Sequence, residues 1–318
     1  MDKKKQNSIL KCWVAFVVMC IMSGASVEGY WFYIPFDVSM KKNRYPKAIA
    51  TTKAVMGIDG EVLYFLFADL FDNNNISRLV EMNEDFSSLR IPKRIHQIWL
   101  GSLLPDVFKS YVASWKKYEE QGWTYTLWTD KEVETLELEN RDLYDAATNY
   151  GEKSDILRYE LIYQFGGVYV DIDNIALRDI EVLHYAYDFY IGMQPLDSLF
   201  VQVGTGIFGA RSHHPIVKKA IEGLRHNQDK PGIPARSGPV YFTQLLYHSL
   251  LAYDNEVCGR CIVLPGSYLY PLGCRDSYTP AYLEKPEAYA IHLWSKSWMD
   301  PKYRPPQFRT LSASSASD

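Results

Sequence analysis

Two aspartates one residue apart, Asp171 and Asp173, follow the apolar segment Val168 to Val170. Neighbouring carboxylates repel each other, and a hard divalent cation relieves that repulsion while leaving coordination positions for the oxygens of a diphosphate. The pair therefore predicts a metal site that binds an anionic ligand. An Asp-x-Asp pair is frequent by chance in a chain of this length, so a solvated loop is the simpler interpretation of the pair taken alone.

Two further charged residues, Asp155 and Arg158, precede the aspartates in a segment that we expect to be helical. Ser154 suits the N-cap position, Asp155 suits the positively polarised first turn, and Gly166 or Gly167 suits the left-handed position at the C-terminal end. Residues three apart share a helix face, so Asp155 and Arg158 can pair or can both reach a ligand above the sheet. The alternative is an ion pair on the protein surface.

The elements that must position these residues alternate between strand and helix. The sequence predicts a strand from Arg94 to Gly101, an amphipathic helix from Val107 to Gly122 and a second strand from Trp123 to Asp130. Strand, helix and strand in this order predict a right-handed crossover and a parallel sheet. Ligands bind beyond the carboxyl ends of the strands in such sheets, and Asp171 and Asp173 lie at one of these ends.

The same signals divide the chain into regions. Residues 91–300 are predicted to form an α/β catalytic domain, because the pattern continues through GIFGAR, a helix from Pro215, the segment SGPVYFTQLLYHSLL and AIHLWSKSW. Residues 26–90 begin with YWFYIPF and contain EVLYFLFADLF, which predicts an N-terminal helical extension that packs on this domain. Residues 301–318 are rich in serine towards their end and are expected to form a disordered tail.

The first 25 residues have the order of a secretory signal peptide: lysines, an apolar run from Cys12 to Met22 and then small residues. The run is shorter than the roughly 20 apolar residues that span a bilayer, so cleavage near Ala25 is expected. A short signal anchor that holds the protein to the membrane is the alternative. Both predict an exported protein that is lumenal, periplasmic or secreted. The net charge of −4 leaves no basic face for nucleic acid.

Three cysteines, Cys258, Cys261 and Cys274, lie close together in the sequence. In an exported protein we expect one local disulfide among them and one remaining thiol, with the pairing left open. The alternative is a zinc site with a fourth ligand such as His248, because tetrahedral zinc needs four ligands.

The segments IPKRIHQIWLG, LWTD, SDILRYELIYQFGGVYVDID and AIHLWSKSW together resemble DxD-motif sugar transferases. This family includes the fungal initiating α-mannosyltransferases and, more distantly, the glucosylating domains of large clostridial toxins. The resemblance covers about residues 91–298. It implies a Rossmann-like nucleotide-sugar fold of the GT-A type, a bound Mn²⁺ or Mg²⁺, and transfer of a hexose with retention of configuration. A nucleotide sugar is then the donor, and a glycan, a lipid or a protein is the acceptor.

The resemblance also implies roles for individual residues. Asp173 would bind the metal directly, and Asp171 would face sugar and ribose hydroxyls or bind the metal through water. Asp155 and Arg158 would hold the donor sugar. His292 would be a further metal ligand, with a structural histidine as the alternative.

Three aromatic residues complete this assignment. Tyr169 would contact the ribose. Trp99 would stack on the base, with burial in the core as the alternative. His96 is assigned to the structure rather than to the chemistry.

Two rival functions remain open at this point. VYVDIDNI matches the first motif of haloacid-dehalogenase-type phosphatases, but no later acidic motif of the GDxxxD kind follows Asp173. The second rival is a non-catalytic carbohydrate-binding protein on a decayed transferase fold, against which the intact acids and Arg158 argue. The sequence does not select among UDP-glucose, UDP-galactose, UDP-N-acetylhexosamine and GDP-mannose.

Overall fold

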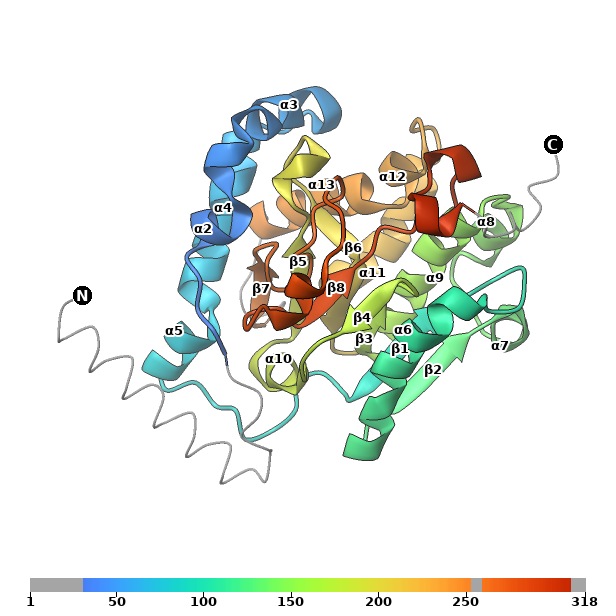
Figure 1. Ribbon diagram of the computed structural model, residues 1–318, viewed down its shortest axis with the longest axis horizontal. Coiled ribbons are helices and arrows are strands. Elements are labelled where there is room, and N and C mark those ends of the chain that lie inside the picture. The colour runs from blue at the N-terminus through green and yellow to red at the C-terminus, as the bar shows by residue number, and fades with distance from the viewer. Residues whose placement is uncertain (1–30, 253–258, 310–318) are drawn as a thin grey trace.

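The computed structural model describes residues 31–252 and 259–309 of the chain, so the signal predicted for residues 1–25 lies outside the described residues. A six-stranded sheet lies at the centre (Figure 1). Its strands, in spatial order, are β2 (Thr124–Trp128), β1 (Arg94–Ile98), β3 (Gly167–Val170), β6 (Val203–Ala210), β5 (Phe189–Met193) and β7 (Cys261–Leu264). Neighbouring strands are parallel except at β6, which is antiparallel to both β3 and β5. The predicted α/β fold with a mostly parallel central sheet is confirmed.

The predicted first crossover is confirmed. β1 and β2 pair in parallel, with Arg94 opposite Thr124. The connection is α6 (Asp106–Lys116), which tightens into a 3-10 turn at Lys117–Gln121. Gly122 ends this turn at φ 81°, a left-handed conformation that glycine adopts without steric cost.

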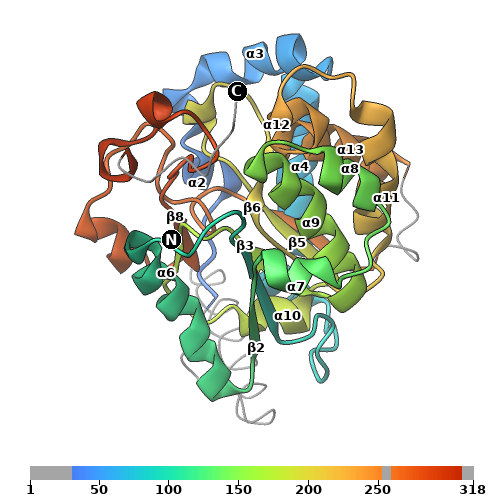
Figure 2. The ribbon, with the colours of Figure 1, turned by 90° about the vertical axis from the view of Figure 1, so that its right-hand side faces the viewer.

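Helices cover both faces of the sheet. One face is covered by α9 (Tyr150–Phe165), α11 (Pro215–Gly223) and α13 (Pro239–Leu251), while α6 lies on the other side (Figure 2). Shorter helices connect the elements: α7 (Asp130–Glu134), α8 (Arg141–Ala146), α10 (Glu181–Ala186) and α12 (Ile233–Arg236). The result is a large hydrophobic core around the strands and a smaller second cluster that includes Phe108 of α6.

The start of α9 differs from the sequence prediction. The helix begins at Tyr150, and its N-cap is Asn149, whose Oδ1 accepts a hydrogen bond of 2.8 Å from the backbone N–H of Gly151. The prediction of Ser154 as N-cap is therefore wrong, and Asp155 lies in the second turn rather than the first. Asn149 caps a backbone N–H of the first turn about one turn before the predicted position, so the helix contains an additional turn before Ser154.

A two-stranded antiparallel ribbon crosses the carboxyl end of β3. It consists of β4 (Asn174–Ala176) and β8 (Ala290–His292). Asn174 pairs with His292 in this ribbon, and the backbone N–H of Leu293 donates to the carbonyl of Asp173 at 3.0 Å. The ribbon thus brings a segment from the end of the chain beside the two aspartates.

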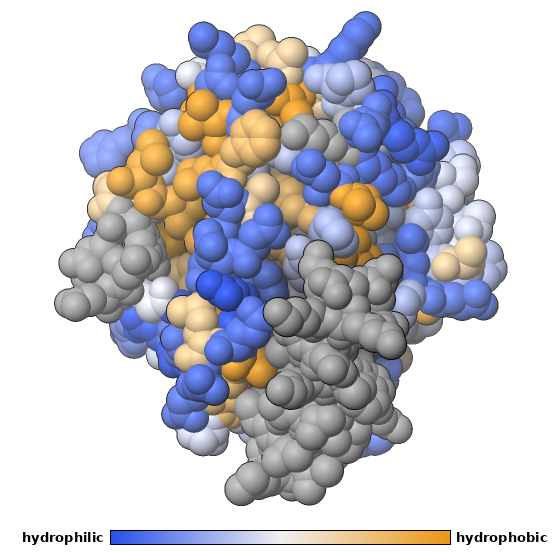
Figure 3. Space-filling model, turned by 90° about the vertical axis from the view of Figure 1, so that its left-hand side faces the viewer, coloured by the Kyte–Doolittle hydropathy of each residue, from blue (hydrophilic) through white to orange (hydrophobic). Residues whose placement is uncertain are grey.

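The predicted N-terminal helical extension consists of α2 (Phe36–Met40), α3 (Pro46–Met56), α4 (Gly60–Asn74) and α5 (Ile76–Glu81). α4 packs on β7, and its Phe71 lies 5.9 Å from Tyr268, measured between ring centroids. Figure 3 shows apolar side chains gathered on this side of the molecule, and the exposed ones on α4 are Val62 and Phe65.

The C-terminal segment differs from the predicted disordered tail. Two 3-10 turns, Pro301–Tyr303 and Pro306–Phe308, follow the last strand. Phe308 is fully buried and stacks on Phe108 of α6 at 5.9 Å. Burial of this aromatic ring orders the segment as far as Arg309, so the prediction is wrong for residues 301–309. Residues 310–318 lie outside the described part of the chain.

Two of the three clustered cysteines, Cys261 and Cys274, lie in the described part of the chain, and Cys258 lies outside it. Cys261 is buried in β7, with its Sγ 3.8 Å from His214 Nε2, and Cys274 carries a free thiol. The predicted disulfide and its zinc alternative stay predictions. In residues 31–252 and 259–309, no helix has the length and apolar character that a membrane crossing needs.

Candidate active site

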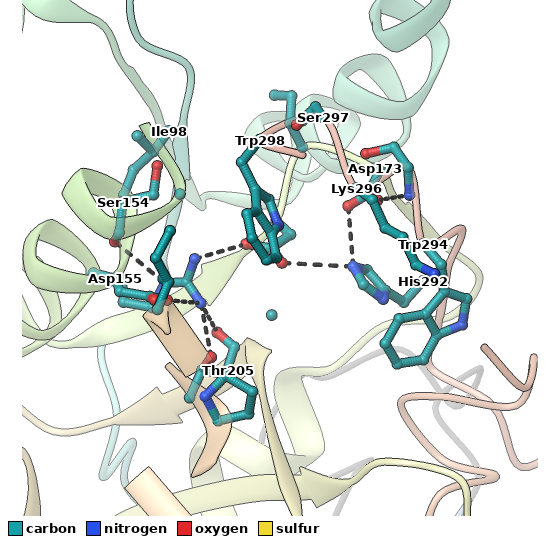
Figure 4. A pocket seen from close by; sticks show the side chains of 18 of the residues that line it. Ile98, Ser154, Asp155, Asp173, Thr205, His292, Trp294, Lys296, Ser297 and Trp298 are labelled. Carbon is teal, nitrogen blue, oxygen red and sulfur yellow. Dashed lines mark hydrogen bonds and ion pairs between the residues drawn. The ribbon is translucent and has the colours of Figure 1, made fainter. Parts of the chain in front are cut away.

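A cavity of about 340 Å³ opens at the carboxyl ends of β1 and β3. Its walls come from β1, α9, β3, β6 and the segment from Trp294 to Met299. Figure 4 shows Asp155 and Thr205 on one side of this cavity and His292 and Trp294 on the other. A cavity of this size, lined by apolar rings and a few convergent charged groups, is typical of a small-molecule site.

Asp171, Asp173 and His292 bring one ligand atom each to within 4.8 Å of one another. His292 Nε2 lies 3.1 Å from Asp173 Oδ1 and 3.5 Å from Asp171 Oδ2. The pairing of β4 with β8 causes this approach, because it places His292 opposite Asn174. Two carboxylates and an imidazole are a ligand set that Mn²⁺ accepts, and the residues present therefore fit a divalent cation.

The charge on His292 is set by its carboxylate neighbours. Burial opposes the imidazolium, but the charges of Asp173 and Asp171 and their hydrogen bonds overcome that cost and raise the pKa of His292 to about 9. Ring contacts fix the imidazole plane, since the Trp294 ring packs edge-on at 4.3 Å and the Tyr270 ring at 5.7 Å. Without metal, a proton on His292 therefore offsets one of the two aspartate charges.

Asp173 also holds a loop of the cavity wall. Its Oδ2 accepts a hydrogen bond of 2.6 Å from the backbone N–H of Ser295, and its side chain is buried. This bond leaves Oδ1 facing His292. Asp173 is thus both a candidate metal ligand and an anchor for the segment that follows β8.

Asp171 is surrounded by donors. Its Oδ1 accepts hydrogen bonds from the Tyr169 hydroxyl at 2.6 Å and from Arg158 Nη2 at 3.2 Å. Burial alone would raise the pKa of Asp171, but the Arg158 charge and the His292 contact lower it to about 2. Room for the carboxylate depends on Gly206, where a Cβ atom would lie 2.6 Å from Asp171 Oδ2.

Arg158 is a buried connector rather than half of a surface ion pair. Its Nη1 lies 3.0 Å from Asp155 Oδ1 and donates to Thr205 Oγ1 at 2.8 Å, while its Nε donates to the Ser154 carbonyl at 3.2 Å. The guanidinium also lies 4.6 Å from the centroid of the Tyr169 ring. The alternative that Asp155 and Arg158 form an ion pair on the protein surface is wrong, because α9 packs against β3 and β6 and both side chains are buried.

Asp155 accepts a second hydrogen bond, from Ser237 Oγ to its Oδ2 at 3.0 Å. Burial raises the pKa of Asp155 to about 6, although Arg158 and Ser237 oppose the shift. Ser237, Thr205 and Ser295 all position site residues, and sequence reasoning missed them. Ser295 belongs to the segment AIHLWSKSW, but all three lie 47 to 122 residues along the chain from their partners, so no local signal shows which side chain each of them contacts.

The aromatic candidates have distinct surroundings. Trp99 lines the cavity and also packs on Phe108 at 5.2 Å between ring centroids. Its ring therefore contributes both to the cavity wall and to the hydrophobic packing beneath it. Tyr169 is buried with its hydroxyl bound to Asp171, and its ribose contact stays a prediction. Burial lowers the pKa of His96 to about 4, and its ring nitrogens contact the Gly166 carbonyl and Trp128 Nε1, which agrees with a structural role.

Known proteins match the part of the chain that builds this cavity. Residues 105–190 match the family described as "Glycosyltransferase sugar-binding region containing DXD motif". The predicted resemblance to DxD-type sugar transferases is confirmed. Inositol phosphoceramide mannosyltransferase 1 of Schizosaccharomyces pombe is 25% identical over 221 residues, which cover 66% of this chain and 62% of that protein.

Two further proteins are similar to the sugar transferase region. The uncharacterized glycosyltransferase L373 of Acanthamoeba polyphaga mimivirus is 24% identical over 222 residues, covering 65% of this chain and 84% of that one. Among solved structures, PaToxG glycosyltransferase has a TM-score of 0.41 and 20% identity, over 63% of this chain and 83% of that chain. The family and sequence matches support glycosyltransferase activity rather than the phosphatase alternative.

Proposed function

We propose that the protein is a metal-dependent, retaining glycosyltransferase that moves a hexose from a nucleotide sugar to an acceptor. One observation carries this proposal: Asp171, Asp173 and His292 converge at the carboxyl end of β3, beside a buried Arg158–Asp155 pair. A metal site next to groups suited to sugar hydroxyls matches the two needs of the reaction, which are stabilisation of a departing diphosphate and orientation of the sugar.

The roles of the residues follow from their surroundings. Asp173 and His292 would hold the ion, with Asp171 binding it directly or through water. A bound cation supplies Lewis-acid chemistry at the leaving diphosphate. Asp155 and Arg158 would orient the donor sugar, because Asp155 lines the cavity and Arg158 fixes the direction of its carboxylate. Trp99 would stack on the nucleotide base and Tyr169 would contact the ribose.

Mn²⁺ is the cofactor that the ligand set favours. Mg²⁺ prefers oxygen ligands in regular octahedral geometry, whereas an imidazole nitrogen beside two carboxylates suits a softer transition-metal ion. Mg²⁺ remains the alternative that the same assays test.

The donor is proposed to be a nucleotide sugar, and the acceptor a glycan, a lipid or a protein. The mannosyltransferase relative is named for inositol phosphoceramide, which favours a glycolipid among these classes. An exported location, with or without membrane association through the N-terminus, remains part of the proposal.

Thermal unfolding with Mn²⁺ and each of the four candidate nucleotide sugars tests the function. A ligand at about 100 times its dissociation constant stabilises the fold by roughly 2.7 kcal/mol, so the true donor raises the melting temperature only when Mn²⁺ is present. Transfer from that donor to an inositol glycolipid, followed by NMR of the anomeric proton, then tests acceptor class and retention. A protein that binds a donor without hydrolysis or transfer is instead the non-catalytic carbohydrate-binding alternative.

A further inference from the structure

The departing diphosphate of the proposed reaction needs positive charge besides the metal. Three cationic side chains line the cavity: Arg158, His292 and Lys296. Arg158 directs its guanidinium to Asp155, Asp171 and Thr205. His292 faces two aspartates. Neither of these two side chains is available to a phosphate without breaking buried ion pairs.

Lys296 is different. Among residues 31–252 and 259–309, no carboxylate lies within 4.0 Å of its ammonium group, and the group makes no hydrogen bond. Burial and Asp197 raise the pKa of the Cys274 thiol in the cavity wall. The positive charge of Lys296 partly opposes this rise. A half-buried lysine that has no ion pair, at the wall of an acidic cavity, can bind an incoming anion.

The backbone that carries Lys296 is fixed on both sides. Ser295 N–H is bound to Asp173, and the Trp298 carbonyl accepts a hydrogen bond of 3.1 Å from Asn149 Nδ2 at the start of α9. Lys296, between these anchors, and Trp294, just before the first of them, have φ values of 52° and 54°, in the left-handed region that non-glycine residues rarely adopt. Such a loop places Lys296 at the cavity wall, next to the segment that carries the candidate metal ligand His292 (Figure 4).

From these contacts we infer that Lys296 is a further catalytic residue, one that binds the terminal phosphate of the leaving nucleoside diphosphate. The inference rests on the proposed glycosyltransferase function. When the bond between the anomeric carbon and the phosphate oxygen breaks, its electron pair stays on that oxygen, and the ammonium group of Lys296 stabilises the negative charge that develops there. Arg158 then orients the sugar and does not contact the diphosphate.

The test compares Lys296→Met, which keeps the length of the side chain, with Lys296→Arg, which keeps the charge. The control is Lys302→Met, because Lys302 is an exposed lysine six residues further on that pairs with Asp300 outside the cavity. Calorimetry measures binding of a nucleoside diphosphate and the matching monophosphate, each with and without Mn²⁺. Transfer kinetics are measured on the same proteins.

Loss of a charge-assisted hydrogen bond of about 1.5 to 3 kcal/mol predicts that Lys296→Met weakens diphosphate binding about 10-fold to 100-fold, also without Mn²⁺. Monophosphate binding should change less than about twofold. We expect kcat to fall in Lys296→Met and to recover in part in Lys296→Arg, while Lys302→Met stays at the level of the unmodified protein. The melting temperature of the ligand-free protein should not change, since Lys296 holds no ion pair.

Two outcomes overturn the inference. If the unmodified protein binds a diphosphate and transfers sugar but Lys296→Met does both equally well, Lys296 has no such role and the proposed function stands. If the unmodified protein binds no nucleoside diphosphate with Mn²⁺, the inference fails together with the proposed function.

Discussion

At the scale of single residues, the site sets two cationic side chains, Arg158 and His292, against three carboxylates. Asp155 and Asp171 share Arg158, and Asp171 and Asp173 share His292. A proton on His292 therefore takes the position in which a divalent cation would bind. In the proposed function, a metal ion has to replace this proton, so the affinity for the metal should depend on pH.

The first prediction at this scale concerns Asp173→Asn. Removing one anionic ligand should lower turnover by about 1000-fold, because a metal ion contributes several kcal/mol of transition-state stabilisation. The fold should survive, since the asparagine carbonyl can still accept from Ser295 N–H. Asp155→Asn should instead disturb sugar binding and leave diphosphate binding with Mn²⁺ unchanged, whereas Asp171→Asn should impair both.

Calorimetric titration of a nucleoside diphosphate, with and without Mn²⁺, separates these variants. The control is Asp106→Asn, an exposed acid at the start of α6. Metal-dependent binding at full strength in Asp173→Asn would exclude this residue as a ligand.

The second prediction concerns pH. The pKa of His292 in the metal-free fold is about 9, above its ordinary value, so its ion pairs stabilise the fold fully below about pH 6.5 and are lost as the pH rises through 9. A metal ligand must be the neutral imidazole, so the apparent Mn²⁺ affinity should rise about tenfold per pH unit up to about pH 9 and then level off.

Calorimetry at neutral pH, in buffers of different ionisation enthalpy, should show close to one proton released per Mn²⁺ bound. His292→Gln should bind Mn²⁺ more weakly and release no proton. Equal proton release in His292→Gln would assign the proton to another group.

At the scale of elements, the site depends on contacts between segments that are distant in sequence. The ribbon of β4 and β8 joins His292 to the aspartates, and Asn149 joins the start of α9 to the loop before Met299. Gly151 permits this second contact, since a Cβ atom there would lie 2.8 Å from the Trp298 ring. The pairing of β4 with β8 and the side-chain hydrogen bonds of Asp173 and Asn149 therefore hold this part of the cavity wall in place.

Two substitutions of Asn149 separate its helix-capping bond from its hydrogen bond to the Trp298 carbonyl. Asn149→Ala loses the helix cap and the hydrogen bond to the Trp298 carbonyl, so it should cost about 1 kcal/mol of stability and weaken donor binding roughly threefold. Asn149→Asp keeps a cap acceptor but has no donor for that carbonyl, so it should retain stability and lose only donor affinity. Chemical denaturation and donor KM are the measurements, and equal donor KM in all three proteins would contradict a role for this contact in binding.

At the scale of the whole molecule, the N-terminal extension and the sheet share one hydrophobic core. Phe67 and Phe71 of α4 are fully buried, and Phe71 contacts both Trp31 and Tyr268. The exposed side of the same helix carries Phe65. The extension is therefore expected to unfold together with the catalytic region rather than as a separate unit.

Phe71→Ala tests whether the extension and the catalytic region unfold cooperatively. Truncation of a buried phenylalanine typically costs about 3 to 5 kcal/mol, so a single unfolding transition should shift to lower denaturant concentration. Phe65→Ala, on the exposed face of α4, is the matched control and should change the free energy of unfolding by less than about 1 kcal/mol. Two separate transitions in Phe71→Ala would show instead that the extension unfolds independently.

Local sequence determined much of this arrangement. The apolar runs around Ile95 and Val168, the glycines after Phe165 and the spacing of Asp171 and Asp173 fix strands, turns and the end of the sheet at which a ligand binds, because these signals act over a few residues. The same stretch also contained Asp155 and Arg158. Their burial was not visible, since burial depends on which helix covers which strand.

Only the tertiary structure decided the rest. His292 and Ser295 reach Asp173, and Ser237 reaches Asp155, across 82 to 122 residues of chain. Hydrogen bonds between such residues form through strand pairing and helix packing, for which a single sequence carries no local signal. The order of the C-terminal segment has the same origin, because Phe308 is buried only where Phe108 meets it. The motif thus predicted the candidate site residues, and long-range packing determined which side chains hold them in place.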